Sequence, residues 1–147
     1  MTEVQELIKS LVDRETNCWN TQNAADLVEI FHPDMMWSWP PTAKDHNPED
    51  WILGFGRYNR ERWQGNWQGL FDSFELVHNL REIVCIKTTE EEDGGFAVVD
   101  IDTLWRNKET GEEDHWKGRV CKMYTKTADG WKLIAHTGVL DYSIVDT

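Results

Sequence analysis

The stretch Phe96–Asn107 (FAVVDIDTLWRN) constrains the fold most, because it alternates between two faces and the following segment can fold back on it. Asp100 and Asp102 share one face, and apolar residues occupy the other. A tight turn at Lys108–Gly111 (KETG) leads into a second alternating segment, His115–Thr125 (HWKGRVCKMYT). A period of two is typical of β-strands with two distinct faces. The two segments therefore predict an antiparallel hairpin.

Closing this hairpin at its turn sets which residues face one another. Asp100 then lies opposite Arg119, and Asp102 lies opposite Lys117. Opposite charges in cross-strand pairs stabilise a sheet, so one interpretation is an ordinary solvated face. The other interpretation is that these charges line a concave pocket, where ionisable groups carry out chemistry. The assignment of the two faces is left open at this point.

The rest of the chain places helices before the sheet. Apolar spacings of three and four predict a helix from Thr2 to about Asn20, which begins with a capping box formed by Thr2 and Gln5. Its inner stripe comprises Val4, Leu7, Ile8, Leu11, Val12, Glu15 and Trp19. Further helices are predicted over 23–31 and from Trp51 towards Gly65, and strands over 35–39, 73–87, 96–107, 115–125 and 131–144. Helices followed by a meander indicate an α+β fold, and 147 residues fit a single domain over 1–147.

Composition narrows the classes of partner. The net charge is −12 and no cluster of Lys and Arg is present, so nucleic acid and anionic membrane surfaces are not expected partners. Three cysteines without C-x-x-C spacing and five scattered histidines predict no metal site. No nucleotide-binding motif is recognised, so no cofactor is expected. No signal-like or membrane-spanning segment is recognised either, which predicts a cytoplasmic protein.

Nine tryptophans are an unusual number for a chain of this length. Aromatic side chains supply large contact areas, so the number predicts a wide aromatic cavity, a subunit interface, or both. The expected lining of a ligand-binding pocket is Trp19, Phe31, Trp37, Trp39, Trp51, Phe55 and Trp63.

Two parts of the chain resemble the nuclear transport factor 2-like superfamily. Residues 26–34 (DLVEIFHPD) are similar to a family stretch with Asp, Leu, Phe and Asp in this order. Gly118 and Arg119, followed by residues 129–136 (DGWKLIAH), are similar to its closing strands. The resemblance implies a curved antiparallel sheet wrapped by helices into a cone-shaped α+β barrel, with an internal apolar pocket and usually a homodimer. Members range from ketosteroid isomerases, polyketide cyclases and scytalone dehydratase to a non-catalytic kinase association domain.

The pairing can be extended to the next turn, residues 126–130 (KTADG), which would place Cys121 beside His136. One face would then carry Asp100, Asp102, Lys117, Arg119, Cys121 and His136. We expect this face to line the pocket, with the reverse assignment as the alternative.

Roles for these candidates follow from their chemistry. Asp100 or Asp102 would be the catalytic base, Arg119 an electrostatic stabiliser, and His136 an acid–base partner. The alternatives are a structural ion pair between Asp100 and Arg119, and a packing role for His136.

Two functions are consistent with these features. The first is a cofactor-free enzyme of isomerase, cyclase, dehydratase or hydrolase type, acting by acid–base chemistry on a hydrophobic, ring-containing substrate. The second is a non-catalytic ligand-binding or oligomerisation domain. Both predict a small hydrophobic or aromatic ligand and a homodimer as partners.

Overall fold

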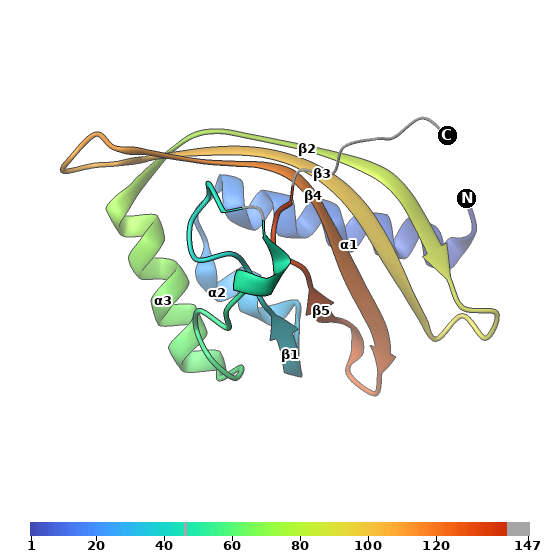
Figure 1. Ribbon diagram of the computed structural model, residues 1–147. Helices are drawn as coiled ribbons and strands as arrows, with labels where there is room; N and C mark the ends of the chain where they lie inside the picture. The colour runs from blue at the N-terminus through green and yellow to red at the C-terminus, as the bar shows by residue number, and fades with distance from the viewer. Residues whose placement is uncertain (46, 141–147) are drawn as a thin grey trace, which may run out of the picture.

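The computed structural model describes residues 1–45 and 47–140, and in this part of the chain helices pack against one five-stranded sheet. The elements are α1 (Glu3–Asn20), α2 (Ala24–Glu29), β1 (Phe31–Trp37), the 3-10 turn η1 (Pro48–Asp50), α3 (Arg60–Ser73), β2 (Phe74–Thr88), β3 (Gly94–Asn107), β4 (Glu113–Thr127) and β5 (Gly130–His136). Figure 1 shows the long strands β2, β3 and β4 curving over α1, with α3 at one end of the arch. The predicted α+β class is confirmed.

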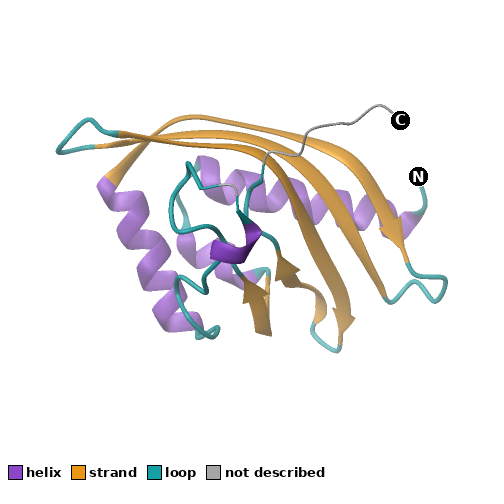
Figure 2. Cartoon of the chain, viewed as in Figure 1, coloured by secondary structure: helices purple, strands orange, loops and turns teal. Residues whose placement is uncertain are grey.

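The sheet has the strand order β1-β5-β4-β3-β2. The pairs β2–β3, β3–β4 and β4–β5 are antiparallel, whereas β1 runs parallel to β5. The sheet is therefore mixed rather than wholly antiparallel, and within the described residues it is open rather than closed into a barrel. The parallel pair arises because the chain leaves β1 through α3 and enters the sheet again at the opposite edge. The helices lie on the concave side of this curved sheet (Figure 2).

Helix α1 begins as the sequence predicts. The Thr2 hydroxyl accepts a hydrogen bond from the Gln5 backbone N–H at 3.2 Å, and the Gln5 side chain accepts one from the Thr2 N–H at 2.9 Å. This capping box satisfies two N–H groups that a helix start leaves free. The helix buries one stripe against the sheet, and that stripe includes the carboxylate of Glu15 as well as apolar side chains.

The segment between β1 and β2 differs from its prediction. Instead of a helix from Trp51, η1 is followed by a loop, and α3 begins only after Asn59, whose side chain accepts a hydrogen bond from the Arg62 N–H. Gly56 has a φ of +69°, a left-handed conformation that favours glycine and that an α-helix cannot contain. A side chain on Gly54 would lie 2.4 Å from the ring of Trp39, so the loop approaches that ring closely.

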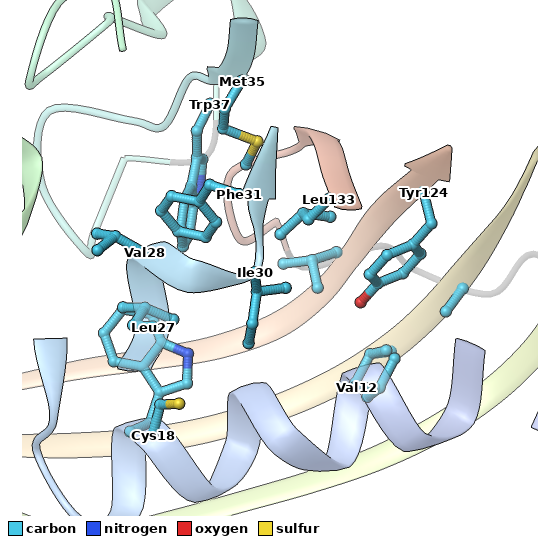
Figure 3. Close-up of a cluster of buried hydrophobic side chains, with 14 of the residues drawn as sticks. Val12, Cys18, Leu27, Val28, Ile30, Phe31, Met35, Trp37, Tyr124 and Leu133 are labelled. Atoms are coloured by element: carbon cyan, nitrogen blue, oxygen red, sulfur yellow. The ribbon is translucent and has the colours of Figure 1, made fainter. Parts of the chain in front are cut away.

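The main core lies between the concave face of the sheet and the helices. Figure 3 shows side chains from α2, β1 and β4 converging above α1, among them Leu27, Phe31 and Tyr124. Fully burying a side chain of this size stabilises the fold by about 1.5–3 kcal/mol. This core contains side chains of α1, α2, β1, β4 and β5, and it positions the groups described below.

The pairing of the central strands decides which side chains face inward. Between β3 and β4 the observed partners are Asp100–Arg119 and Asp102–Lys117, as the turn predicts. Between β4 and β5 the register differs. Tyr124 pairs with Leu133 and Met123 pairs with Ala135, so Ile134 is an extra residue on β5. Such a β-bulge shifts every later side chain of the strand to the other face.

Candidate functional site

A cavity of about 240 Å³ opens on the concave side of the sheet, between β3, β4, α3 and the loop after β1. This volume lies just below the roughly 300–1,000 Å³ of pockets that hold drug-sized ligands, so it suits a small ligand. The aromatic side chains of its wall are Trp19, Trp37, Trp39, Phe55, Trp67, Phe71, Phe74, Trp105 and Trp116.

The rings of this wall support one another through edge-to-face contacts. The centroids of Trp19 and Trp67 lie 4.9 Å apart with perpendicular planes, and those of Trp39 and Phe55 lie 5.1 Å apart at 83°. Aromatic pairs of this geometry contribute about 0.5–1.5 kcal/mol beyond the area that they bury. The wall is thus a rigid apolar surface that can receive a flat ring.

A few polar groups interrupt the apolar wall, and Arg81 on β2 is the most prominent. Its Nε donates a hydrogen bond to the Asn79 side chain at 2.8 Å, and its guanidinium lies 5.6 Å from the ring centroid of Trp19. Nη1 is 3.7 Å from the Glu15 carboxylate. Burial lowers the pKa of Arg81, although Glu15 opposes this shift. Arg81 therefore presents a largely desolvated cation at the cavity.

Behind the cavity wall lies a buried charged network of Glu15, Lys122 and His136. Glu15 is 0% exposed and Lys122 is 1% exposed. Lys122 Nζ donates to Glu15 Oε2 at 2.7 Å, and the same oxygen accepts from Trp19 Nε1 at 3.0 Å. Lys122 Nζ is also 2.7 Å from Nε2 of His136. Glu15 thus joins α1 to β4, and Lys122 connects it to the histidine in the wall.

Burial and charge shift the pKa values of all three groups. Burial alone would raise the pKa of Glu15, but the nearby charges of Lys122, of His136 once it is protonated, and of Arg81 outweigh it and lower the value to about 2. Burial lowers the pKa of Lys122 to about 8, with Glu15 opposing this shift. Burial and the charge of Lys122 hold the pKa of His136 well below its ordinary 6.5. Near neutrality the network therefore holds a carboxylate, an ammonium and a neutral imidazole.

The surroundings of His136 assign its tautomer. Because an ammonium can only donate, Nε2 of His136 accepts from Lys122. The ring proton then resides on Nδ1, which donates to the Thr137 carbonyl oxygen at 2.5 Å. The ring stacks on Trp37 with centroids 3.9 Å apart and also lines the cavity. The neutral imidazole of His136 thus lies between the ammonium group of Lys122 and the apolar wall of the cavity.

The bulge in β5 explains why His136 lies here. The expected partner of His136 was Cys121, which would have placed the imidazole beside Asp100 and Arg119. With Ile134 as an extra residue, His136 pairs with Lys122 instead and points to the concave side. The predicted grouping of His136 with Asp100, Asp102 and Arg119 is therefore wrong, although His136 does reach the cavity.

The other three predicted catalytic residues lie on the convex face of the sheet. Arg119 donates to both carboxylate oxygens of Asp100, at 2.6 and 3.0 Å, and the hydrogen bonds lower the pKa of Asp100. Asp102 is hydrogen-bonded to His115 and to His78, and these hydrogen bonds lower the pKa of Asp102, the one to His115 more strongly. The cavity is lined from the opposite face by Ile101, Thr103 and Trp105. The expectation that the Asp/Arg face lines the cavity is thus not met.

The predicted aromatic lining separates into two groups. Trp19, Trp37, Trp39 and Phe55 line the cavity. Phe31 and Trp63 are buried in the aromatic cluster behind it, where their centroids lie 6.1 Å apart. Trp51 is half-buried in the loop after η1 and is not part of the wall.

Sequence reasoning did not single out Arg81, Glu15 or Lys122 as functional. Glu15 had a recognisable signal, because it is a charged residue within the apolar stripe of α1. Lys122 had a weaker one, since it lies between Val120 and Tyr124 at a period of two and both of these are buried. Such positions indicate a buried charge that needs a partner.

No protein-family model matches the chain, and no match was found among curated proteins. None of the helices in the described ranges is both long and apolar enough to cross a membrane.

Solved structures do resemble the chain. A ketosteroid isomerase-like protein from Erwinia carotovora atroseptica aligns with a TM-score of 0.71 at 14% identity, over 97% of this chain and 100% of that one. A scytalone dehydratase-like protein from Novosphingobium aromaticivorans aligns at 0.67 and 15% identity, over 99% and 94%. A nuclear transport factor 2-like superfamily protein from Salmonella enterica aligns at 0.66 and 13% identity, over 97% and 94%. At these identities the likeness concerns the fold, and the chain has the nuclear transport factor 2-like fold.

Proposed function

We propose that this protein is a cofactor-free enzyme that acts by acid–base chemistry on a small, hydrophobic, ring-containing substrate in the Trp-lined cavity. The observation that carries the proposal is the neutral imidazole of His136, which lines the cavity and contacts a lysine whose pKa is about 8. Strongly perturbed pKa values in a cleft are typical of functional sites. Isomerases, cyclases, dehydratases and hydrolases all use proton transfers of this kind.

The residues of the site suggest how a proton would move. If Lys122 turns its hydrogen bond fully onto Glu15, Nε2 of His136 becomes free to accept a proton from the substrate. The imidazolium formed would lie 3.9 Å from the Glu15 carboxylate, which favours it, and beside the Lys122 ammonium, which opposes it. His136 would therefore give the proton back readily. Negative charge on the substrate would be stabilised by the Arg81 guanidinium at the wall. Return of the proton to another atom of the substrate completes an isomerisation, and loss of a leaving group completes an elimination.

A second candidate function is ligand binding without chemistry. The observation that favours it is that both ring nitrogens of His136 already have partners, Lys122 and the Thr137 carbonyl. In that case the buried network is a structural connection between α1 and the sheet, and the cavity is a binding site only. The two functions predict the same ligands but differ in turnover.

Variants at His136 distinguish the two functions. We expect His136→Gln to lower turnover by about 10²–10⁴-fold, the usual contribution of a general base, while ligand affinity stays within about threefold. Glutamine is suitable because its side-chain oxygen can still accept the hydrogen bond of Lys122. Ligands would first be found among ring compounds by quenching of tryptophan fluorescence, and turnover of the binders would then be followed by NMR.

Asp100→Asn in the same assay tests the catalytic role predicted for that residue. Because the Asp100 carboxylate lies on the convex face, we expect full turnover from this variant. If wild type and His136→Gln turn over the substrate equally fast, the proposed mechanism is contradicted. Binding of ring compounds with no turnover of any of them would favour the second function.

The convex face also suggests how the expected homodimer forms. Met36, Met123 and Phe96 form a row across the sheet: Met36 and Met123 lie on either side of Ala135, and Phe96 pairs with Met123. These three residues are 66%, 49% and 36% exposed. An exposed apolar row of this kind is typical of an interaction surface. We propose that a second copy of the chain covers it.

Placing a charge in this row should prevent dimer formation. We expect Met123→Glu to convert a dimer into a monomer, because each copy would bury a glutamate in the proposed interface. Light scattering after size-exclusion chromatography measures the mass directly. Ala128→Glu, in the exposed turn before β5, is the matched control and should leave the mass unchanged. A wild-type chain that is monomeric at high concentration would contradict the proposed interface.

A further inference from the structure

We propose that His78, Asp102 and His115 form a binding site for a divalent transition-metal ion of the zinc class on the convex face of the sheet. Nε2 of His78 lies 2.8 Å from Oδ1 of Asp102, and Nε2 of His115 lies 2.6 Å from the same oxygen. The three ligand atoms all lie within 4.8 Å of one another. This site is separate from the cavity and does not depend on the proposed function.

The sheet itself holds the three side chains in place. Leu104 on β3 pairs with His78 of β2 on one side and with His115 of β4 on the other. Asp102 precedes Leu104 by two residues, so it points to the same face and lies diagonal to both histidines. Side chains in such diagonal positions can reach one another. Because each ligand comes from a different strand of one continuous sheet, the geometry is set by backbone pairing rather than by a loop.

The set of donor atoms indicates the kind of ion. Two imidazoles and one carboxylate are typical ligands of Zn²⁺ and of Fe²⁺ sites that keep open positions. Mg²⁺ and Ca²⁺ prefer sites made of oxygen atoms. Among divalent first-row ions other than copper, zinc binds nitrogen and oxygen ligands strongly. We therefore expect zinc, with cobalt as its spectroscopic substitute.

The exposure of the three side chains leaves room for further ligands. The side chains of His78, Asp102 and His115 are 37%, 29% and 48% exposed. Three protein ligands on one side of an ion leave the solvent side for water, as in zinc sites that are not closed by a fourth protein ligand. Asp102 lies opposite Lys117 in the β3–β4 pairing, yet its side chain is hydrogen-bonded to the two histidines. The carboxylate is thus already oriented toward the imidazole nitrogens.

Binding can be measured directly on the full chain without a histidine tag. Isothermal titration with zinc chloride is expected to show one saturable ion per chain, and magnesium chloride at a hundredfold excess should not compete. Titration with cobalt chloride is expected to give visible d–d absorption without thiolate charge-transfer bands. His78→Gln and His115→Gln should each weaken zinc binding more than about a hundredfold, because the loss of a residue that only orients a ligand costs about 10–100-fold.

The controls separate this site from binding elsewhere. His32→Gln removes an imidazole on β1, outside the cluster, and should leave zinc affinity unchanged. Circular dichroism shows whether each variant is folded. The proposal is overturned if wild type shows no saturable zinc binding, if the double variant of His78 and His115 binds as well as wild type, or if cobalt gives thiolate bands that assign the ion to a cysteine.

Discussion

Replacing Lys122 with methionine is expected to lower the free energy of unfolding by about 3–5 kcal/mol, the usual cost of removing one partner of a buried ion pair. The methionine side chain is one heavy atom shorter than that of lysine, so the loss comes mainly from charge rather than from a large cavity. Glu15 would remain 0% exposed with its principal counter-charge gone. Guanidinium denaturation followed by tryptophan fluorescence measures the change.

Two further variants separate this effect from a general weakness of β4. Lys126→Met removes an exposed lysine from the same strand and should change stability by no more than about 0.5 kcal/mol. Glu15→Leu combined with Lys122→Met removes both charges and should cost less than the sum of the single changes. A Lys122→Met protein as stable as wild type would show that the buried pair does not bear on stability.

A second expected result is a loss of stability in mild acid that depends on His136. The folded protein keeps this imidazole neutral because its pKa lies well below 6.5, whereas the unfolded chain takes up a proton near that value. Below pH 6.5 the unfolded state therefore binds more protons, and stability falls as the pH falls. Each pH unit between 6.5 and the folded-state pKa of His136 costs up to about 1.4 kcal/mol, whereas above pH 6.5 this group adds almost no loss.

The comparison with His136→Gln isolates this contribution. Below pH 6.5 its unfolding free energy is expected to fall less steeply than that of wild type, by up to about 1.4 kcal/mol per pH unit. The test compares how steeply the unfolding free energy depends on pH, so an overall loss of stability in the variant does not obscure the result. His32→Gln should keep the wild-type slope because His32 lies outside the buried network. Equal slopes for wild type and His136→Gln would mean that the folded protein accepts the proton.

The central hairpin could be predicted from sequence because a short turn leaves little freedom. The turn at Lys108–Gly111 links two alternating strands, and it fixes the pair Asp100–Arg119 that the structure contains. The capping box at Thr2 was equally local, since both partners lie within four residues. Contacts set by neighbouring residues are those that a single sequence reveals.

The position of His136 could not be predicted because the bulge at Ile134 has no local signature. A regular alternation through 133–136 gives a plausible strand, and the bulged pairing is seen only when β5 lies between β4 and β1 in the sheet. For a similar reason, the sequence did not show which face of the sheet lines the cavity. Asp100 and Arg119 satisfy each other on the convex side, so their charges did not reveal whether they faced water or a cavity.

The cluster of His78, Asp102 and His115 was also beyond reach of sequence spacing. Its members are separated by 24 and 13 positions, and they meet only because three strands lie side by side. Metal motifs that can be recognised from spacing place their ligands on one helix or one loop. A site assembled across a sheet requires the register of every strand that contributes to it.

The extra residue at Ile134 affects how His136 should be aligned with residues of distant homologues. Here the inward side chain follows Leu133 by three positions, whereas a strand without the insertion would present its inward side chain after two. Residue-by-residue superposition without a gap would thus match His136 to an outward position. An alignment that opens a gap opposite Ile134 would compare His136 with the side chain that occupies the same interior location.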